Sequence, residues 1–215
     1  MFHGGQLGLF PFSSLRKVTL FSVNADEKSS YETGRFPLNR TAAWLFLPSI
    51  KSLDLFRCKM NRFCPISISI SLRGLLKRLR PWLSVTSLTS ITFRDSVVDM
   101  DALYDMLSHC KSLKSFDFQW GDPEDDSRQI DYGKFGCALR TQRHSLETLK
   151  LDAIKVIDDY GPAIGKIKHS IKWLGSLQNF EKLSYVDVPG HAIEGWKIPL
   201  GLDKILPPNI QTLKI

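Results

Sequence analysis

The residue types that most often carry chemistry are present in this chain, but they are scattered. The five histidines lie apart, and His109-Cys110 is an adjacent pair, not the spaced pair that a zinc site needs. The carboxylate pairs Asp125-Asp126 and Asp158-Asp159 fall in expected loops, whereas catalytic carboxylates need burial. No phosphate-binding glycine loop, Gly-x-Ser-x-Gly elbow or dinucleotide-binding motif occurs. We therefore expect a protein that is not an enzyme, and assign no catalytic residue, metal site or cofactor.

The most regular feature of the sequence is a repeated motif in which polar residues alternate with leucines and other apolar residues. In the stretch 144–152 the apolar residues follow the spacing Leu-x-x-Leu-x-Leu, and the last five residues alternate polar and apolar. This alternation is the period of a β-strand with one buried face. The spacing returns six more times, with its first apolar residue at positions 15, 50, 88, 113, 183 and 210. Each copy is predicted to form one strand.

The segments between the copies predict helices and loops. Helices are expected over 41–47, 72–80, 99–109, 130–143 and 170–180. Asp99 is expected to cap the third of these, because its carboxylate can accept hydrogen bonds from the first free N–H groups of a helix. Residues 1–14 and 24–37 are polar or glycine-rich and are expected to be loose.

A fixed strand motif with connections of variable length predicts an α/β solenoid. The copies begin 25 to 38 residues apart, which leaves room for parallel strands joined by right-handed crossovers. Each strand has one apolar face, which is buried only when the next unit stacks on it. A doubly wound sheet is the alternative, but its strands are usually continuously apolar. We expect a single domain over 1–215, with about seven parallel strands and with helices or loops on the convex side.

Three stretches resemble the degenerate leucine-rich repeats of fungal F-box-type proteins: LPSIKSLDL (47–55), ALRTQRHSLETLKL (138–151) and LPPNIQTLKI (206–215). Cys58 matches the cysteine-containing form of this repeat. The equivalent positions of other copies hold different residues, so irregular turns are expected there: Val23, Ser96, Gly121, Ile154 and His191. The resemblance implies substrate recognition for a cullin-type ubiquitin ligase. However, no adaptor-docking F-box is recognisable in 1–40, and the array ends on a strand at Ile215, as a truncated array would.

In such strands the apolar positions point into the core and the intervening positions line the open, concave face. That face is expected to contain Lys17, Thr19, Phe21, Ser52, Asp54, Phe56, Ser90, Thr92, Arg94, Ser115, Asp117, Gln119, Thr148, Lys150, Asp152, Tyr185, Asp187, Thr212 and Lys214. We assign binding of a protein partner to Asp54, Phe56, Arg94, Asp117, Gln119, Trp120, Lys150, Asp152, Tyr185 and Asp187. Aromatic residues on a polar face are typical anchors of interfaces, although Phe56 and Tyr185 would also fit beneath a loop.

The net charge of +7 comes from the N-terminal third of the chain. Residues 1–80 hold 13 Lys and Arg against 4 Asp and Glu, and the remainder holds 16 against 18. Two basic stretches make a nucleic-acid-binding or scaffold protein the alternative function: Arg73, Lys77, Arg78 and Arg80 in one, and Lys166, Lys168, His169 and Lys172 in the other. Both are expected on the convex side, outside any recognisable nucleic-acid-binding motif.

The remaining features indicate an intracellular protein, cytoplasmic or nuclear. The four cysteines form no CxxC pair and are expected to be free, mostly buried thiols of a reducing compartment. The N-terminus lacks the pattern of a signal peptide. The longest apolar run, 42–47, is far too short to cross a bilayer, so no membrane association is expected.

Overall fold

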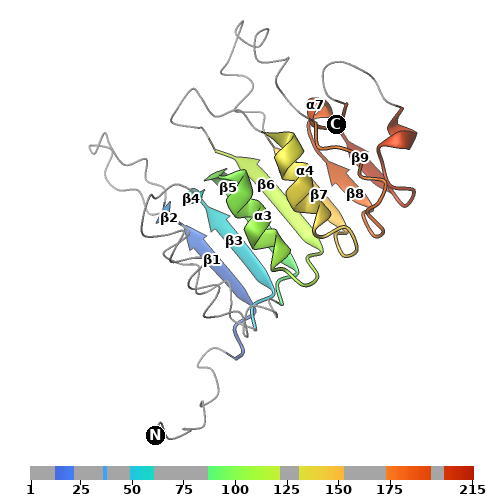
Figure 1. The fold of residues 1–215 in the computed structure, drawn as a ribbon. Helices are drawn as coiled ribbons and strands as arrows, with labels where there is room; N and C mark the ends of the chain where they lie inside the picture. Colours follow the sequence, from blue (N-terminus) through green and yellow to red (C-terminus); the bar gives the residue numbers. More distant parts are fainter. Residues whose placement is uncertain are drawn as a thin grey trace, which may run out of the picture.

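A computed structural model describes residues 13–21, 36–37, 49–60, 87–121, 131–152, 173–194 and 201–215. In this part the chain is an α/β protein with an unclosed parallel sheet (Figure 1). Its main path contains β1 (Lys17–Phe21), β3 (Ser52–Phe56), β5 (Ser90–Val98), β6 (Ser115–Trp120), β7 (Thr148–Asp152), β8 (Tyr185–Asp187) and β9 (Thr212–Lys214). These strands lie side by side in the order of the sequence, each parallel to the next. The prediction of seven parallel strands is confirmed.

One hydrogen-bond pattern recurs where each copy of the motif meets the next. The backbone carbonyl of Lys114 accepts from the N–H groups of Glu147, at 2.7 Å, and Thr148, at 2.9 Å. Five further carbonyls accept from two consecutive N–H groups in the same way, those of Arg16, Lys51, Thr89, Glu147 and Ser184. Each strand begins two residues after the first apolar residue of its copy. The leucine spacing therefore fixes the register of the strands as well as their positions.

The core lies on one face of the sheet, beneath α3 (Met100–Ser108) and α4 (Tyr132–Arg140) (Figure 1). Strand residues such as Phe93, Phe116 and Phe118 are fully buried there. Phe135 of α4 packs against two of these rings, with centroid distances of 5.8 Å to Phe116 and 5.7 Å to Phe118. Tilted and edge-on ring pairs at these distances add to the stabilisation from burial alone.

Helices α3 and α4 each begin where the sequence supplies a capping carboxylate. Asp99 Oδ1 accepts hydrogen bonds from the N–H groups of Asp101 and Ala102, so the predicted cap of α3 is confirmed. Asp131 caps α4 in the same way, by accepting from Lys134 N at 2.9 Å. The helix expected over 130–143 is shorter than predicted, because residues 141–145 form turns that lead into β7.

Gln142 connects α3, β6 and the turn after α4. Its side chain is buried, with 3% of its surface exposed. Its Oε1 accepts from Leu113 N at 3.1 Å, and its Nε2 donates to the carbonyls of Leu107, at 2.6 Å, and Cys110, at 3.0 Å. These three bonds join backbone groups at the end of one unit to the beginning of the next, and the Leu107 carbonyl also accepts from Cys110 N.

A second, shorter set of strands follows a sharp change of direction after β3 and within β5. Arg57 and Asp95 have φ angles of +53° and +46°, which non-glycine residues rarely adopt. Beyond them, β4 (Cys58–Met60) pairs with the end of β5 and with β2 (Phe36–Pro37). Phe36–Pro37 lies in the segment expected to be loose, so that expectation is wrong for these two residues. A short strand of two residues carries too little periodicity to be recognised.

Cys58 and Ser96 occupy equivalent positions at this change of direction, and both are fully buried. The Cys58 N–H donates to Ser96 Oγ at 3.2 Å, and that hydroxyl donates to the carbonyl of Arg94 at 2.8 Å. The register between β5 and β6 shifts between Phe93 and Ser96. The expectation of an irregular turn is confirmed for the copy that contains Ser96.

The helix predicted over 170–180 is wrong for its described part, 173–180, which contains no helix. Leu174 and Leu177 are buried, but their N–H groups donate to the carbonyls of Ala192 and Ile205, outside this segment. Gly175 has a φ angle of +83°, which is incompatible with a continuous helix. The final units contain the short helix α7 (Gly190–Glu194) and the 3-10 helix η3 (Leu202–Lys204). The helices expected over 41–47 and 72–80 lie outside the described residues.

Candidate protein-binding face

The polar positions of the seven main strands lie on the face of the sheet opposite to α3 and α4, which we call the open face. Its members are Lys17, Thr19, Phe21, Ser52, Asp54, Phe56, Ser90, Thr92, Arg94, Ser115, Asp117, Gln119, Thr148, Lys150, Asp152, Tyr185, Asp187, Thr212 and Lys214. All are half-buried or exposed, while the residues that alternate with them along β6 and β7 are buried. The predicted division of the strand residues between core and open face is therefore confirmed at these positions.

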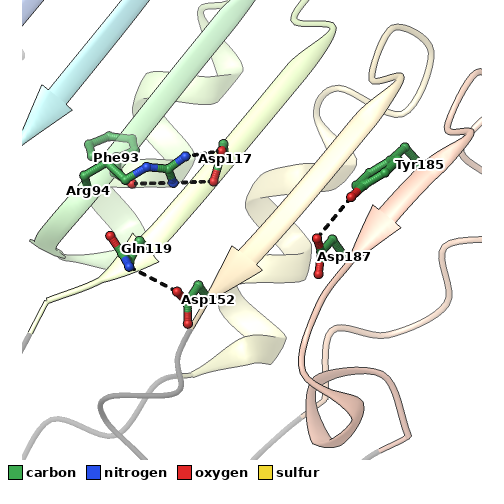
Figure 2. A network of polar contacts seen from close by, with 7 residues as sticks. All are labelled: Phe93, Arg94, Asp117, Gln119, Asp152, Tyr185 and Asp187. Carbon is green, nitrogen blue, oxygen red and sulfur yellow. Dashed lines mark hydrogen bonds and ion pairs between the residues drawn. The ribbon is translucent and has the colours of Figure 1, made fainter. Parts of the chain in front are cut away.

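Two ion pairs cross between strands on the open face. Arg94 of β5 donates through Nη1 and Nη2 to the two carboxylate oxygens of Asp117 on β6 (Figure 2). The hydrogen bond to Asp117 is the largest effect on the pKa of Arg94 and raises it above its ordinary value. Lys17 Nζ of β1 lies 2.6 Å from Asp54 Oδ2 of β3. The charges of these side chains are thus paired across adjacent strands.

Two further carboxylates of the open face are held by neutral donors. Gln119 Nε2 donates to Asp152 Oδ2 at 3.1 Å, and the Tyr185 hydroxyl donates to Asp187 Oδ2 at 3.1 Å (Figure 2). All four carboxylates of the open face therefore have a side-chain partner on the same face. Two of these partners are cations and two are neutral.

Two lysines of the open face make no such pair and lie on either side of Tyr185. The Nζ atoms of Lys150 and Lys214 lie 5.2 Å and 5.6 Å from the centre of the Tyr185 ring. Neither forms an ion pair with a carboxylate of the described residues. The pKa of Lys214 is raised above its ordinary value. The largest cause is its hydrogen bond with the Tyr185 side chain, and the charge of Asp187 adds to it. The ammonium form is therefore favoured between β7 and β9.

An apolar patch lies at the other end of the open face. Phe21 and Phe56 are paired in register across β1 and β3, and 65% and 39% of their surfaces are exposed. Their neighbour in the next strand is Arg94. Two adjacent phenylalanines exposed on a sheet favour contact with another molecule more than a single exposed apolar residue would.

The structure places nine of the ten residues assigned to partner binding on the open face: Asp54, Phe56, Arg94, Asp117, Gln119, Lys150, Asp152, Tyr185 and Asp187. The tenth, Trp120, is a correction. It is 7% exposed and packs in the core, with its ring centroid 4.4 Å from that of Phe118. The alternation of β6 continues to its last residue, so Trp120 shares the inward face of Phe118.

Three residues that were expected on the face, but were not assigned to partner binding, complete its charged and apolar groups. Lys17 pairs with Asp54, Phe21 extends the patch around Phe56, and Lys214 lies beside Tyr185. Each of these residues matters because of the residue beside it on the next strand. These neighbours can be read from the sequence, because aligning the copies of the leucine motif also aligns their polar positions.

A separate pair of titratable residues lies at the carboxyl ends of the strands, on the core side. The Tyr132 hydroxyl and His191 Nε2 are 3.0 Å apart, and both rings pack beside the core. Burial lowers the pKa of His191. Burial also raises the pKa of Tyr132, and the negative charge of Asp152 raises the pKa of Tyr132 further. This pair joins α4 to α7, and we assign it a structural role.

Other chemical expectations bear on residues only partly described. Cys58 and Cys110 are free and buried, as expected, whereas Cys137 is free and exposed. Among the described residues, no group of three or more His, Cys, Asp or Glu side chains is arranged to hold a metal ion. The acidic pairs and both basic stretches lie outside the described residues.

Comparison of the chain with known protein families, curated proteins and solved structures finds no match. Within the described part of the chain, no helix has both the length and the apolar character needed to cross a membrane.

Proposed function

We propose that this chain is a non-enzymatic interaction module that binds a protein partner on the open face. The observation that carries the proposal is the composition of that face, which combines charged side chains already held in position with exposed aromatic residues. Fixed charges reduce the entropy lost on binding, and aromatic residues supply apolar contact area. Nothing in this proposal depends on a bound cofactor or metal.

We further propose that the sheet is part of a right-handed solenoid similar to leucine-rich repeats. The sequential strand order supports this, because a doubly wound sheet reverses its order at a switch point. The recurring carbonyl that accepts two N–H groups also supports it, since it repeats at each junction of the main strands. Cys58 and Ser96 add a short row of buried residues at the turn that follows the strand.

The balance of charge on the open face favours a protein partner over nucleic acid. The face carries four cations and four carboxylates, so its formal charges cancel. The carboxylates are spread over β3, β6, β7 and β8, and a phosphate backbone crossing the sheet would meet them repeatedly. Nucleic-acid binding instead needs several cations on one surface.

The resemblance to fungal F-box-type proteins suggests a cellular context, the recognition of substrates for a cullin-type ubiquitin ligase. This context is a separate proposal from partner binding. Co-purification of the ligase adaptor with the full gene product would support it. A full gene product that binds its partner but never the adaptor would overturn the ubiquitin context and leave the binding role intact.

Affinity capture with matched variants tests the binding role. The face variant replaces Asp54, Phe56, Lys150 and Tyr185 by alanine. The control variant replaces Tyr104, Lys134 and Glu181, which are exposed residues away from the open face. We expect proteins captured by the wild-type chain to be retained by the control and lost with the face variant.

The two variants must first be shown to fold alike by circular dichroism and thermal unfolding. Capture of the same proteins by the wild-type chain and a folded face variant would overturn the proposed binding face. Loss of capture with the control variant alone would show that the partner binds near the control residues and not on the open face.

A further inference from the structure

The two outer edges of the main sheet carry the two halves of the junction that joins its inner strands. β1 and β9 lie at opposite ends of the strand order, and no described strand pairs with the outer edge of either (Figure 1). At each inner junction, one backbone carbonyl accepts from two consecutive N–H groups of the next unit. The equivalent carbonyl of the seventh unit belongs to Gln211, and the equivalent N–H groups of the first unit belong to Arg16 and Lys17. Among the described residues these three groups have no such partner.

The apolar side chains of the first and seventh units are also less covered than those between them. In the five inner units, all three apolar positions of the motif are buried. Ile215 is 64% exposed, whereas the equivalent residues Leu151 and Val188 are 4% and 2% exposed. A unit in a stack buries these positions only by gaining a neighbour on each side. In the two outer units, five of the six positions are half-buried or exposed: Leu15, Leu20, Ile210, Leu213 and Ile215.

We propose that β1 of a second molecule of this chain adds to the outer edge of β9, parallel to it and in the register of the inner junctions. Arg16 and Lys17 of the second molecule then donate through their N–H groups to the Gln211 carbonyl. The contact also brings together the apolar residues of the two outer units. The proposal is independent of the proposed function, because the sheet edges make the contact and not the open face.

A second molecule suits the edge of β9 because β1 carries the groups that this junction lacks. Every neighbouring pair of main strands is parallel, and each follows the same register. Addition of β1 to β9 preserves both the direction and the order of the strands. Pairing of two β9 edges around a two-fold axis would instead be antiparallel and could not repeat the junction.

The charges beside the new junction balance. Lys17 of the second molecule keeps its ion pair with Asp54, and Asp187 lies in register beside Lys214. The formal charges of these two cations and two carboxylates cancel. Backbone hydrogen bonds and apolar burial therefore favour the contact, and charge does not. We expect the association to change little with sodium chloride concentration, because screening weakens only contacts between charges.

A contact between unlike edges leaves one free edge at each end of the assembly. Such a head-to-tail contact closes into a ring only when the rotation from one molecule to the next permits it. Otherwise it builds an open series, since the free β9 edge of one molecule can always receive another β1. We therefore expect dimers, trimers and larger species, and not a dimer alone.

Sedimentation velocity of the full chain at increasing protein concentration tests the proposal. We compare the wild type with I215K, which places a charge at an exposed residue that the junction would bury. We expect I215K to weaken the association at least about tenfold, because an unpaired charge is costly to bury. The control Y104K makes the same change at an exposed residue of α3 and should assemble as the wild type does. Circular dichroism first establishes that both variants are folded.

A wild-type chain that stays monomeric at every concentration would overturn the proposal. Equal association of the wild type and folded I215K would also overturn it, because the contact would then lie elsewhere.

Disulfide trapping identifies the edges that meet. K17C and T212C are prepared separately, each in a C64S/C137S background, and are then mixed and oxidised. The shared register places these two positions about 4.8 Å apart across the new junction, a separation that a disulfide can span. We expect a disulfide between the two variants in the mixture and none within either variant alone.

Two other results would replace the proposed occupant of the β9 edge. A disulfide in T212C alone would overturn the head-to-tail contact in favour of two β9 edges. A monomeric wild-type chain whose captured partner protein is lost with I215K, but not with Y104K, would overturn the second molecule in favour of a strand of that partner.

Discussion

Arg94 and Asp117 lie diagonally across neighbouring strands and form a two-point ion pair in the middle of the open face (Figure 2). Both side chains are partly shielded from solvent, and the guanidinium is held in one orientation by its two donors. A partner that lies across β5 and β6 therefore meets charges that are already ordered. Less conformational entropy is lost on binding such a surface than on binding mobile side chains.

The pair should also contribute to the stability of the free protein. We expect a double-mutant cycle with R94A and D117A to give a coupling free energy of about 1 kcal/mol, because the geometry is good but solvent still screens the charges. Urea unfolding of the wild type, both single variants and the double variant measures it. Additive effects of the two single substitutions would show that the pair contributes nothing to stability.

The aromatic core and the aromatic patch of the open face should respond very differently to truncation. Phe118 is fully buried among other rings, and F118A should lower the free energy of unfolding by about 3–5 kcal/mol. Phe21 is largely exposed, and F21A should change it by less than about 0.5 kcal/mol. Chemical denaturation compares the two. A large loss of stability in F21A would mean that this side chain supports the fold and is not a free contact surface.

Gln142 should be among the polar residues most important for stability. Q142A removes one hydrogen bond from each of three backbone groups, of which the Leu107 carbonyl still accepts from Cys110 N, so we expect a loss of about 2–4 kcal/mol in the free energy of unfolding. Gln178 is a matched control, because its amide donates to the Asp203 carbonyl at the surface, and Q178A should cost less than about 1 kcal/mol. Equal losses for the two variants would contradict the structural role of Gln142.

The half-buried His191 predicts a pH dependence of stability. Burial lowers its pKa in the folded protein below the ordinary value of 6.5. As the pH falls through 6.5, the unfolded chain therefore binds a proton more readily than the folded chain, and folding stability is lost. Between pH 7.5 and pH 5.5 the wild type should lose more stability than H191Q, in which the amide can still bond to Tyr132. Identical losses in the two proteins would exclude this contribution.

The sequence alone is sufficient to predict the seven main strands and their order, but not β2 and β4. A leucine or isoleucine lies two residues before each of these strands, at the boundary where each unit bonds to the next, and its spacing is the same in all seven copies. The polar positions follow from the same alternation, and for this reason nine of the ten assigned residues lie on the open face. Trp120 is the exception: an aromatic residue beside a polar face is typical of an interface anchor, but the same alternation places this one in the core.

Other features depend on contacts that the spacing does not contain. Leu174 and Leu177 are three residues apart, as on one side of a helix. Their N–H groups nevertheless donate to the carbonyls of Ala192 and Ile205, which lie further along the chain. The left-handed conformations of Arg57 and Asp95 occur at non-glycine residues, so no turn residue marks the start of the second set of strands. Which side chains pair on the open face also depends on register shifts, such as the one between Phe93 and Ser96.

Site-specific photo-crosslinking tests the central proposal, partner binding on the open face, most directly. A photoreactive phenylalanine analogue is incorporated either at Thr92, in the middle of the open face, or at Tyr104, which is exposed on α3. After irradiation with a captured partner, we expect crosslinks from position 92 and none from position 104. Crosslinks from position 104 alone would contradict the assignment of binding to the open face.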